Sequence, residues 1–252
     1  MEHHIQSYLR HAATRGRDTQ RIGPFLATFT LHSTNPFLNY AIPDEGTSPS
    51  PEDIASLIAV YQQRKCIPRL EYIPQLAPAV EPALLASGFH VEERLPLMNC
   101  SPEQFHHPPP PTGIELLSPT TDAEILALVT AQNEAYGEAA PGPDVVRRQR
   151  TFLEAGGIAV LARDSLTGDA VGGGICNVPF DQTTELTSVG VRMPYRRQGI
   201  AAALTARLVQ LAWAAGISTV FLMAAHEAEA RVYARIGFQR IGEVLDIRLM
   251  LT

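Results

Sequence analysis

The spacing of apolar residues along residues 114–252 predicts alternating helices and short strands. Through 199–215 apolar side chains recur every three or four positions, which is typical of an amphipathic helix, and Gly216 predicts its end. Thr121 and Glu124 have the spacing of a capping box, which predicts the start of another helix. Short apolar runs bounded by turn residues predict strands at 158–162, 170–178, 185–191, 220–224 and 238–251.

The order of these elements predicts the class of fold. A helix before Gly156 and a short helix at 227–236 complete the series: two helices, three strands, a helix, a strand, a helix and a strand. Consecutive hairpins followed by a strand–helix–strand crossover make a mixed central sheet with helices on both faces. We therefore expect an α/β (α+β) fold for the second half of the chain.

A run of four prolines separates this half from the rest. Pro108–Pro111 can neither continue a helix nor pair within a central strand, so the run predicts a linker. Before it, Ser50 and Pro51 are typical of a helix start. We expect an N-terminal α+β domain over 1–105, the proline-rich linker over 106–113 and a second domain over 114–252.

The first half of the chain shows a weak similarity to the second in the order of its predicted elements. A predicted strand at 69–73 and a predicted helix at 78–87 are followed by Gly88-Phe89, and the segment finishes Leu-Pro-Leu-Met. The second half has the same order around Gly237-Phe238 and finishes Ile-Arg-Leu-Met. Two interpretations stay open: a degenerate internal duplication, or an unrelated α+β cap.

Composition narrows the class of protein. The formal net charge of −6 argues against a nucleic-acid partner. The three cysteines are an odd, sparse set without a C-x-x-C pair, which favours a reducing compartment and no metal site. No apolar run approaches the ~20 residues of a membrane helix, and Met1–Arg21 lacks the apolar core of a signal peptide. We expect a cytoplasmic protein with no membrane partner.

The strongest local pattern is Arg196-Arg197-Gln198-Gly199-Ile200-Ala201, between a predicted strand and a predicted helix. The first N–H groups of a helix have no helical acceptor, and the helix dipole favours negative charge there. Gly199 lets the backbone approach an anion, and the two arginines add charge-assisted contacts. The segment therefore predicts a diphosphate site, and the alternative is an ordinary basic loop before a surface helix.

This segment resembles the pyrophosphate-binding pattern Gln/Arg-x-x-Gly-x-Gly/Ala of the Gcn5-related N-acetyltransferase (GNAT) superfamily. The preceding Glu185–Val191 is similar to the family's central strand, and Ala230–Phe238 is similar to its tyrosine-bearing helix and the Gly-Phe after it. The three occur in the family's order across residues ~114–252. The resemblance implies the GNAT acyl-CoA N-acyltransferase fold, acetyl-CoA as co-substrate and a degenerate half-GNAT in the first half.

The resemblance also implies roles for individual residues. Tyr233 would protonate the leaving thiolate, with a packed core aromatic as the alternative. Glu185 would act as general base, with an exposed or substrate-orienting strand residue as the alternative. His226 is the second candidate for the general base. It stands near a position where the family often has a CoA-contacting asparagine, and the alternative is a polar surface histidine. The implied cofactor-binding residues are Val189, Gly190, Val191, Arg196, Arg197, Gln198, Gly199, Ile200, Ala201, Ala202 and His226.

Two other features stay open. Gly172-Gly173-Gly174 within a predicted strand predicts a bulge, a close approach of substrate or a plain bend. Cys176 lacks a His/Asp constellation, which favours a buried strand cysteine over a nucleophile.

The expected function is transfer of an acetyl group from acetyl-CoA to a primary amine of a small-molecule acceptor, in a monomer or a homodimer. The alternative is a non-catalytic acyl-CoA-binding module.

Overall fold

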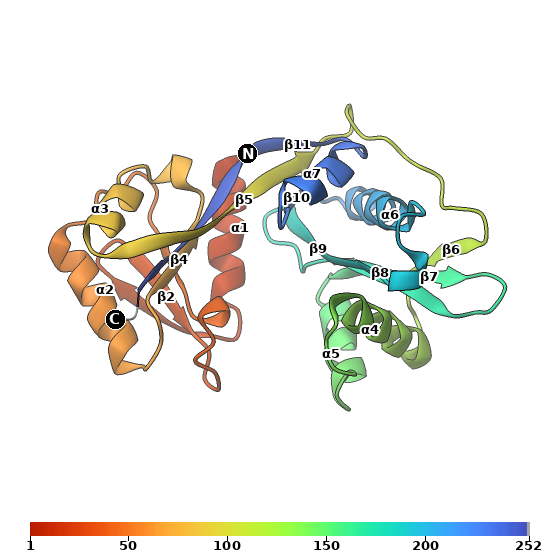
Figure 1. Ribbon diagram of the computed structural model, residues 1–252, viewed down its shortest axis with the longest axis horizontal. Coiled ribbons are helices and arrows are strands. Elements are labelled where there is room, and N and C mark those ends of the chain that lie inside the picture. The colour runs from red at the N-terminus through yellow and green to blue at the C-terminus, as the bar shows by residue number, and fades with distance from the viewer. Residues whose placement is uncertain (251–252) are drawn as a thin grey trace. The chain divides into compact units, whose positions relative to one another are not determined.

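A computed structural model describes residues 1–250 and divides them into two compact units. The first unit consists of Met1–Leu97, Met223–His226 and the chain from Arg240 onward. The second unit consists of Met98–Leu222 and Glu227–Gln239. Each unit is a sheet with helices packed against it, as Figure 1 shows.

The first unit is built on strands in the order β1-β2-β3-β4-β11-β5. The β1–β2 and β2–β3 pairs are antiparallel, β3–β4 is parallel and β4–β11 is antiparallel. Its elements are α1 (Glu2–Thr14), β1 (Asp18–Ile22), β2 (Phe25–Phe29), β3 (Ala41–Pro43), α2 (Pro51–Gln63), β4 (Arg69–Tyr72), α3 (Val80–Ala86), β5 (Phe89–Cys100) and β11 (Phe238–Leu249), with 3-10 turns at Pro36–Leu38 and Pro74–Leu76.

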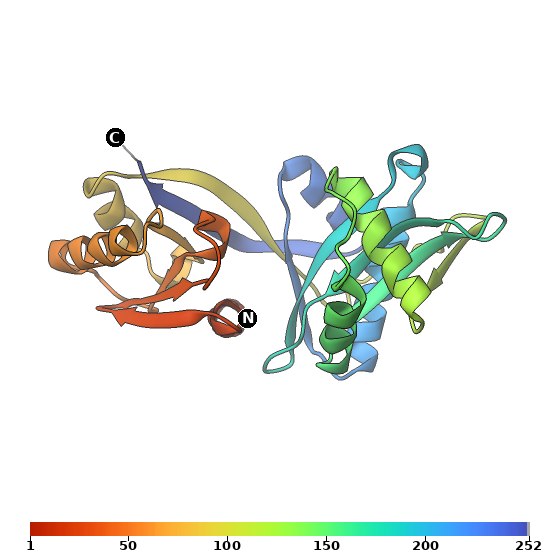
Figure 2. The ribbon, with the colours of Figure 1, turned by 90° about the horizontal axis from the view of Figure 1, so that it is seen from below.

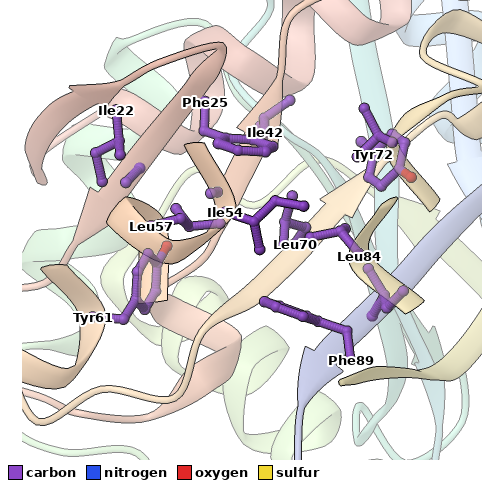
Figure 3. Packing of buried hydrophobic residues seen from close by; sticks show 14 of the residues in the cluster. Ile22, Phe25, Ile42, Ile54, Leu57, Tyr61, Leu70, Tyr72, Leu84 and Phe89 are labelled. Atoms are coloured by element: carbon purple, nitrogen blue, oxygen red, sulfur yellow. The ribbon is translucent and has the colours of Figure 1, made fainter. Parts of the chain in front are cut away.

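The apolar face of α2 forms much of the core of the first unit. Ile54, Leu57 and Tyr61, three and four positions apart on one side of this helix, are buried. They pack with strand residues from β2, β3 and β4, as Figure 3 shows. The predicted start of α2 is confirmed, since Ser50 and Asp53 form a reciprocal capping box.

The second unit has the strand order β10-β9-β8-β7-β6. Only the β9–β10 pair is parallel. Figures 1 and 2 show α4 and α5 on one face of this sheet and α6 on the other. Its elements are β6 (Ile114–Leu117), α4 (Asp122–Tyr136), α5 (Val145–Glu154), β7 (Ile158–Asp164), β8 (Ala170–Cys176), β9 (Thr183–Val191), a 3-10 turn (Met193–Tyr195), α6 (Ile200–Ala214), β10 (Thr219–Met223) and α7 (Glu227–Ala234).

The predicted helices and strands of this half are confirmed to within a few residues. Thr121 and Glu124 form the expected capping box at the head of α4. The turn at Asp181-Gln182 joins β8 to β9 with both residues at positive φ. The structure adds β6, a four-residue strand that the short run Ile114–Leu117 was too brief to indicate.

The two halves of the chain repeat one order of elements. The series β1–β2–β3–α2–β4–α3–β5 matches the series β7–β8–β9–α6–β10–α7–β11. The pair directions match as well: antiparallel, antiparallel, then parallel across the helix. This agreement favours the internal duplication over an unrelated cap.

The compact units divide the chain differently from the expected ranges 1–105 and 114–252: the chain from Met98 clusters with the second unit, and Met223–His226 and the last strand cluster with the first. β11 pairs with β4 over Arg248–Arg69 to Leu245–Tyr72, so the chain from Arg240 onward clusters with the first unit. The expected linker 106–113 clusters with the second unit and contains no helix or strand. Leu251, in the predicted last strand, lies outside the described residues.

Candidate functional site

The loop before α6 has the backbone of an anion-binding turn. Arg197 and Gly199 both have positive φ, +63° and +88°. The first helical hydrogen bond of α6 runs from the Ala203 N–H to the Gly199 carbonyl, at 3.1 Å. The N–H groups of the three residues between, 200–202, therefore have no acceptor within the helix. Because α6 is 15 residues long, its dipole adds positive potential at this end.

A cavity of about 410 Å³ lies against this loop. Three arginines stand in its wall, together with apolar side chains and the loop backbone. Such a wall suits an anionic group attached to an apolar body. The residues that line it are Val191, Tyr195, Arg196, Arg197, Gly199, Ile200, Ala201, Ala202, Val232 and Arg235.

The two arginines of the loop have different tasks. The guanidinium of Arg196 donates to the Val191 carbonyl at 3.0 Å and to the Ala135 carbonyl at 2.6 Å, so it braces the loop against β9 and α4. The Arg197 side chain is exposed and has no hydrogen bond or ion pair within residues 1–250. Arg197 is therefore the loop guanidinium that is better placed to meet a ligand. Gln198 contacts the Pro194 carbonyl at 3.4 Å.

Strand β9, whose Val191 lines this cavity, contains a bulge. Gly190 pairs with Gly173 of β8 and Thr187 pairs with Ile175, so β9 has one extra residue between the two pairs. Ser188 in the bulge has a φ of +55°, which is unusual for a residue with a side chain.

On its other edge β9 separates from β10. The parallel pairing runs from Thr183–Thr219 to Glu185–Phe221 and, within the described chain, goes no further. β9 itself continues to Val191. The edge of β9 that holds Val189, Gly190 and Val191 is therefore open to an extended ligand that adds to it like a strand.

Two of the three glycines of β8 permit helices to pack closely on the two faces of the sheet. A Cβ on Gly173 would lie 2.1 Å from the Leu128 Cδ1 of α4, and one on Gly174 would lie 2.9 Å from the Leu208 Cδ1 of α6. Gly190 of β9 has the same role, since its Cβ would lie 2.9 Å from the Ala135 Cβ. Gly173, Gly174 and Gly190 thus serve the approach of helices. Gly172 instead faces β9, where a Cβ would lie 2.6 Å from the Gly190 carbonyl oxygen, and the bulge itself lies in β9.

Glu185 lies half-buried on β9 and accepts a hydrogen bond from the Asn177 Nδ2 at 3.0 Å. Residues 185 and 187 share a face of the strand because side chains alternate. Thr187 pairs with Ile175, which packs in the cluster under α4, so Glu185 lies on the α4 face. Asn177 is a contact that sequence reasoning missed.

Cys176 is buried beside this glutamate. Burial, and then the charge of Glu185, raise the pKa of its thiol. The thiol stays protonated at neutral pH, which agrees with the expected buried strand cysteine.

Tyr233 is a buried residue of α7, and its hydroxyl donates to the Glu229 Oε1 at 3.3 Å. Its ring meets Phe238 edge-on, with centroids 5.9 Å apart. Burial raises the pKa of the phenol, and the neighbouring Glu229 and Tyr136 raise it further. Tyr233 therefore keeps its proton well above neutral pH, as a proton donor must.

A second, polar cavity of about 360 Å³ lies beside the β9 bulge. It is lined by Gln132, Asn133, Tyr136, Glu138, Thr187 and Ser188. Its residues come from the end of α4, the segment after it and the bulge of β9, where the sequence shows no diagnostic motif. One sign was present in the sequence: Gln132 is a polar residue in the buried stripe that includes Leu128 and Ala131.

His226 is exposed and belongs to Met223–His226, a segment that clusters with the first unit. It is not among the residues that line either cavity of the second unit.

The start of α2 in the first unit differs from the Arg196–Ala202 loop before α6, which we call the anion loop. At the corresponding start of α2, the Ser50 side chain accepts the Asp53 N–H, and two acidic residues, Glu52 and Asp53, stand in the first turn. Both features disfavour an anion. Gln20–Pro24, which superficially copies the phosphate pattern, forms the end of β1 and the hairpin turn before β2.

Comparison with protein families identifies the second unit. Residues 125–238 match the family described as "Acetyltransferase (GNAT) family". The chain carries a GNAT acetyltransferase domain. The matched range includes the bulged strand, the anion loop and the helix of Tyr233, so the predicted resemblance is confirmed.

Solved structures share the fold beyond this GNAT domain. A GCN5-related N-acetyltransferase from Kribbella flavida has a TM-score of 0.81 at 21% identity, covering 100% of this chain and 96% of its own. Another from Sphaerobacter thermophilus has a TM-score of 0.69 at 17% identity, covering 89% and 76%. A tandem GNAT protein from the clavulanic acid biosynthesis pathway has a TM-score of 0.67 at 11% identity, covering 95% and 85%.

At these identities the likeness shows the fold, the mixed α/β fold of GNAT N-acetyltransferases. No curated protein matches the sequence. Residues 1–250 contain no group of three or more His, Cys, Asp or Glu side chains that could hold a metal ion. None of their helices is long and apolar enough to cross a membrane.

Proposed function

We propose that the protein transfers an acetyl group from acetyl-CoA to a primary amine of a small molecule, by direct attack of the amine on the thioester. The observation that carries the proposal is the Arg196–Ala202 loop, whose unpaired N–H groups and exposed Arg197 border a cavity of about 410 Å³. The match of residues 125–238 to the GNAT family supports acyl transfer in general.

The loop would hold the pyrophosphate of acetyl-CoA. The amides of 197–202 offer several donors in one concave turn, and such a turn suits phosphate oxygens. Arg197 would add a charge-assisted contact, and Arg196 would keep the loop in place through its bonds to Val191 and Ala135.

The open edge of β9 would hold the pantetheine arm. The backbone of Val189 and Val191 lies where β10 no longer pairs with β9, so peptide-like groups of the ligand can take the place of a strand. The Val189 N–H would donate to the oxyanion that forms when the amine attacks the thioester carbonyl.

Two side chains would move the protons. Glu185 would take a proton from the attacking amine, directly or through water, as the N–C bond forms. The C–S bond then breaks, and Tyr233 would give its proton to the CoA thiolate. The raised pKa of Tyr233 keeps that proton in place until the thiolate appears.

The acceptor would lie in the polar cavity beside the bulge. Its wall offers amides, hydroxyls and the carboxylate of Glu138, which suits a hydrophilic amine that enters as a cation and loses one proton to water before it attacks. This wall supports a small polar acceptor. The three free, buried cysteines support a reducing compartment, so we propose that the protein acts in the cytoplasm. We propose that it acts there as a monomer or a homodimer.

A non-catalytic acyl-CoA-binding module is the second candidate. It needs the anion loop and the open edge of β9, and it needs neither Glu185 nor the protonated Tyr233. Tight binding of acetyl-CoA without release of CoA across a broad panel of amines would favour it over the enzyme.

Calorimetric titration with acetyl-CoA tests the proposal. We expect micromolar binding by the wild type and loss of binding in the double variant Arg197→Glu/Gly199→Asp, because a carboxylate in the loop repels phosphate. Arg207→Glu is the matched control, since Arg207 is exposed on α6 outside the loop. Wild-type protein that binds no acetyl-CoA would exclude the acetyltransferase.

A further inference from the structure

The bulge of β9 is held in place by one side chain of α4. Gln132, only 8% exposed, donates from its Nε2 to the Ser188 carbonyl at 2.7 Å. Ser188 has a left-handed φ of +55°, which a residue with a Cβ adopts only where its surroundings hold it. The hydrogen bond from Gln132 restrains Ser188 in this conformation.

This bond also determines the direction of a neighbouring donor. The Ser188 carbonyl and the Val189 N–H belong to one planar trans peptide, so they point in opposite directions. A carbonyl held toward α4 by Gln132 therefore turns the Val189 N–H away from α4. That N–H is the donor that the proposed function assigns to the oxyanion.

The rest of the α4 end is packed rigidly against the same strand. Gly190 leaves room for Ala135 and Tyr136, which a Cβ would meet at 2.9 and 3.2 Å. The Ala135 carbonyl accepts from Arg196 at 2.6 Å, which ties the end of α4 to the anion loop. Gln132 thus belongs to a helix end that is packed against β9, and its side-chain amide can position the peptide group between Ser188 and Val189.

We propose that Gln132 is a positioning residue for acyl transfer, which orients the Val189 N–H toward the oxyanion by holding the Ser188 carbonyl. The inference rests on the proposed function and deepens it. Gln132 also lines the polar cavity, so a simple acceptor contact is the competing role. The two roles differ in the kinetic constant that they control.

The test uses the full chain with Gln132→Glu and Gln132→Met. Glutamate keeps the shape of the side chain but places an oxygen against the Ser188 carbonyl, and methionine removes the donor. Gln149→Met on α5 is the matched control, because the buried Nε2 of Gln149 has no hydrogen-bond partner within residues 1–250. Acetyl-CoA affinity, kcat and both KM values are measured with an amine that the wild type acetylates, along with hydrogen exchange of the 187–191 segment.

We expect kcat to fall at least tenfold in both variants, with acetyl-CoA affinity within about threefold of wild type, because the anion loop is intact. Exchange in 187–191 should become faster, and the control should match wild type in every measurement. An unchanged kcat with a raised KM for the amine would overturn the inference and make Gln132 an acceptor contact. A wild type that binds no acetyl-CoA would instead reject the proposed function, and the positioning role with it.

Discussion

Gly199 allows the loop before α6 to adopt its conformation because glycine has no Cβ. Its φ of +88° lies in the region that residues with a Cβ avoid, and this conformation turns the loop so that the first N–H groups of α6 face the cavity. The motif Arg-x-x-Gly-x-Ala is therefore readable in the sequence because the geometry demands a glycine at that position.

Gly199→Ala should lower the free energy of unfolding by about 1–2 kcal/mol, because alanine is strained at this φ. It should also weaken acetyl-CoA binding by at least tenfold, since relief of the strain at φ +88° would shift the loop proposed to hold the pyrophosphate. Chemical denaturation and calorimetry measure the two effects. Gly142→Ala is the control, because Gly142 has ordinary φ and open space around it. Equal stability of the two variants would contradict the argument from strain.

Tyr233 differs from Gly199 because its neighbours, rather than its own backbone, determine its chemistry. The family resemblance predicts Tyr233 as the proton donor, but its raised pKa comes from burial and from the neighbouring Glu229 and Tyr136. A proton donor is active only while it is protonated. Because its pKa is raised, Tyr233 stays protonated to higher pH, and its activity as a donor is lost only above the ordinary tyrosine pKa of about 10.

Tyr233→Phe should reduce kcat by at least tenfold with little change in KM for acetyl-CoA, because the thiolate then leaves without its proton donor. The wild type should show no loss of kcat through Tyr233 between pH 8 and about pH 10, which a kcat–pH profile checks. Tyr61→Phe in the core of the first unit serves as the control. A Tyr233→Phe enzyme with wild-type kcat would remove the residue from the mechanism.

At the scale of elements, close packing of two helices on β8 holds the site together. Period and capping residues predict α4 and α6 from sequence, because both signals are local. Which glycine faces which helix follows only from the fold: Gly173 meets Leu128 on one face and Gly174 meets Leu208 on the other.

Gly173→Ala should destabilise the protein by about 1–3 kcal/mol, because its Cβ would lie 2.1 Å from the Leu128 Cδ1 and α4 would have to shift. The double variant Gly173→Ala/Leu128→Ala should show coupling, since the second change removes the clashing methyl groups. Urea denaturation of both single variants and the double variant measures the coupling. Strict additivity would show that the two residues do not meet.

At the scale of the whole molecule, the last strand of the chain completes the sheet of the first unit. β11 pairs with β4, and Asp246 forms a buried ion pair with Arg69 there, the side chains 6% and 3% exposed. This pair supports the register of β11, because a slip of one residue would turn Asp246 to the other face of the sheet.

Asp246→Ala should lower the free energy of unfolding by roughly 1.5–3 kcal/mol, because the buried Arg69 loses its bond to Asp246 and keeps Glu71, at 3.1 Å, as its carboxylate partner. The triple variant Arg69→Met/Glu71→Gln/Asp246→Leu, which removes all three charges, should recover most of the loss. Arg248→Ala, which breaks the half-exposed pair with Glu92 on the same strand, should cost less than about 1 kcal/mol. A similar loss for Asp246→Ala and Arg248→Ala in urea denaturation would argue against a special role for burial.

The sequence by itself determined the helices and all strands but β6 of the second half, the turn at Arg196–Ala202 before α6 and the family, because each depends on neighbours within a few positions. Tertiary structure alone decided which strand β11 joins and what holds the bulge of β9. Arg69 and Asp246 are 177 positions apart and Gln132 and Ser188 are 56 apart, so no local period or cap predicts either contact. Local patterns specify elements, and packing between distant segments determines which of their polar groups meet.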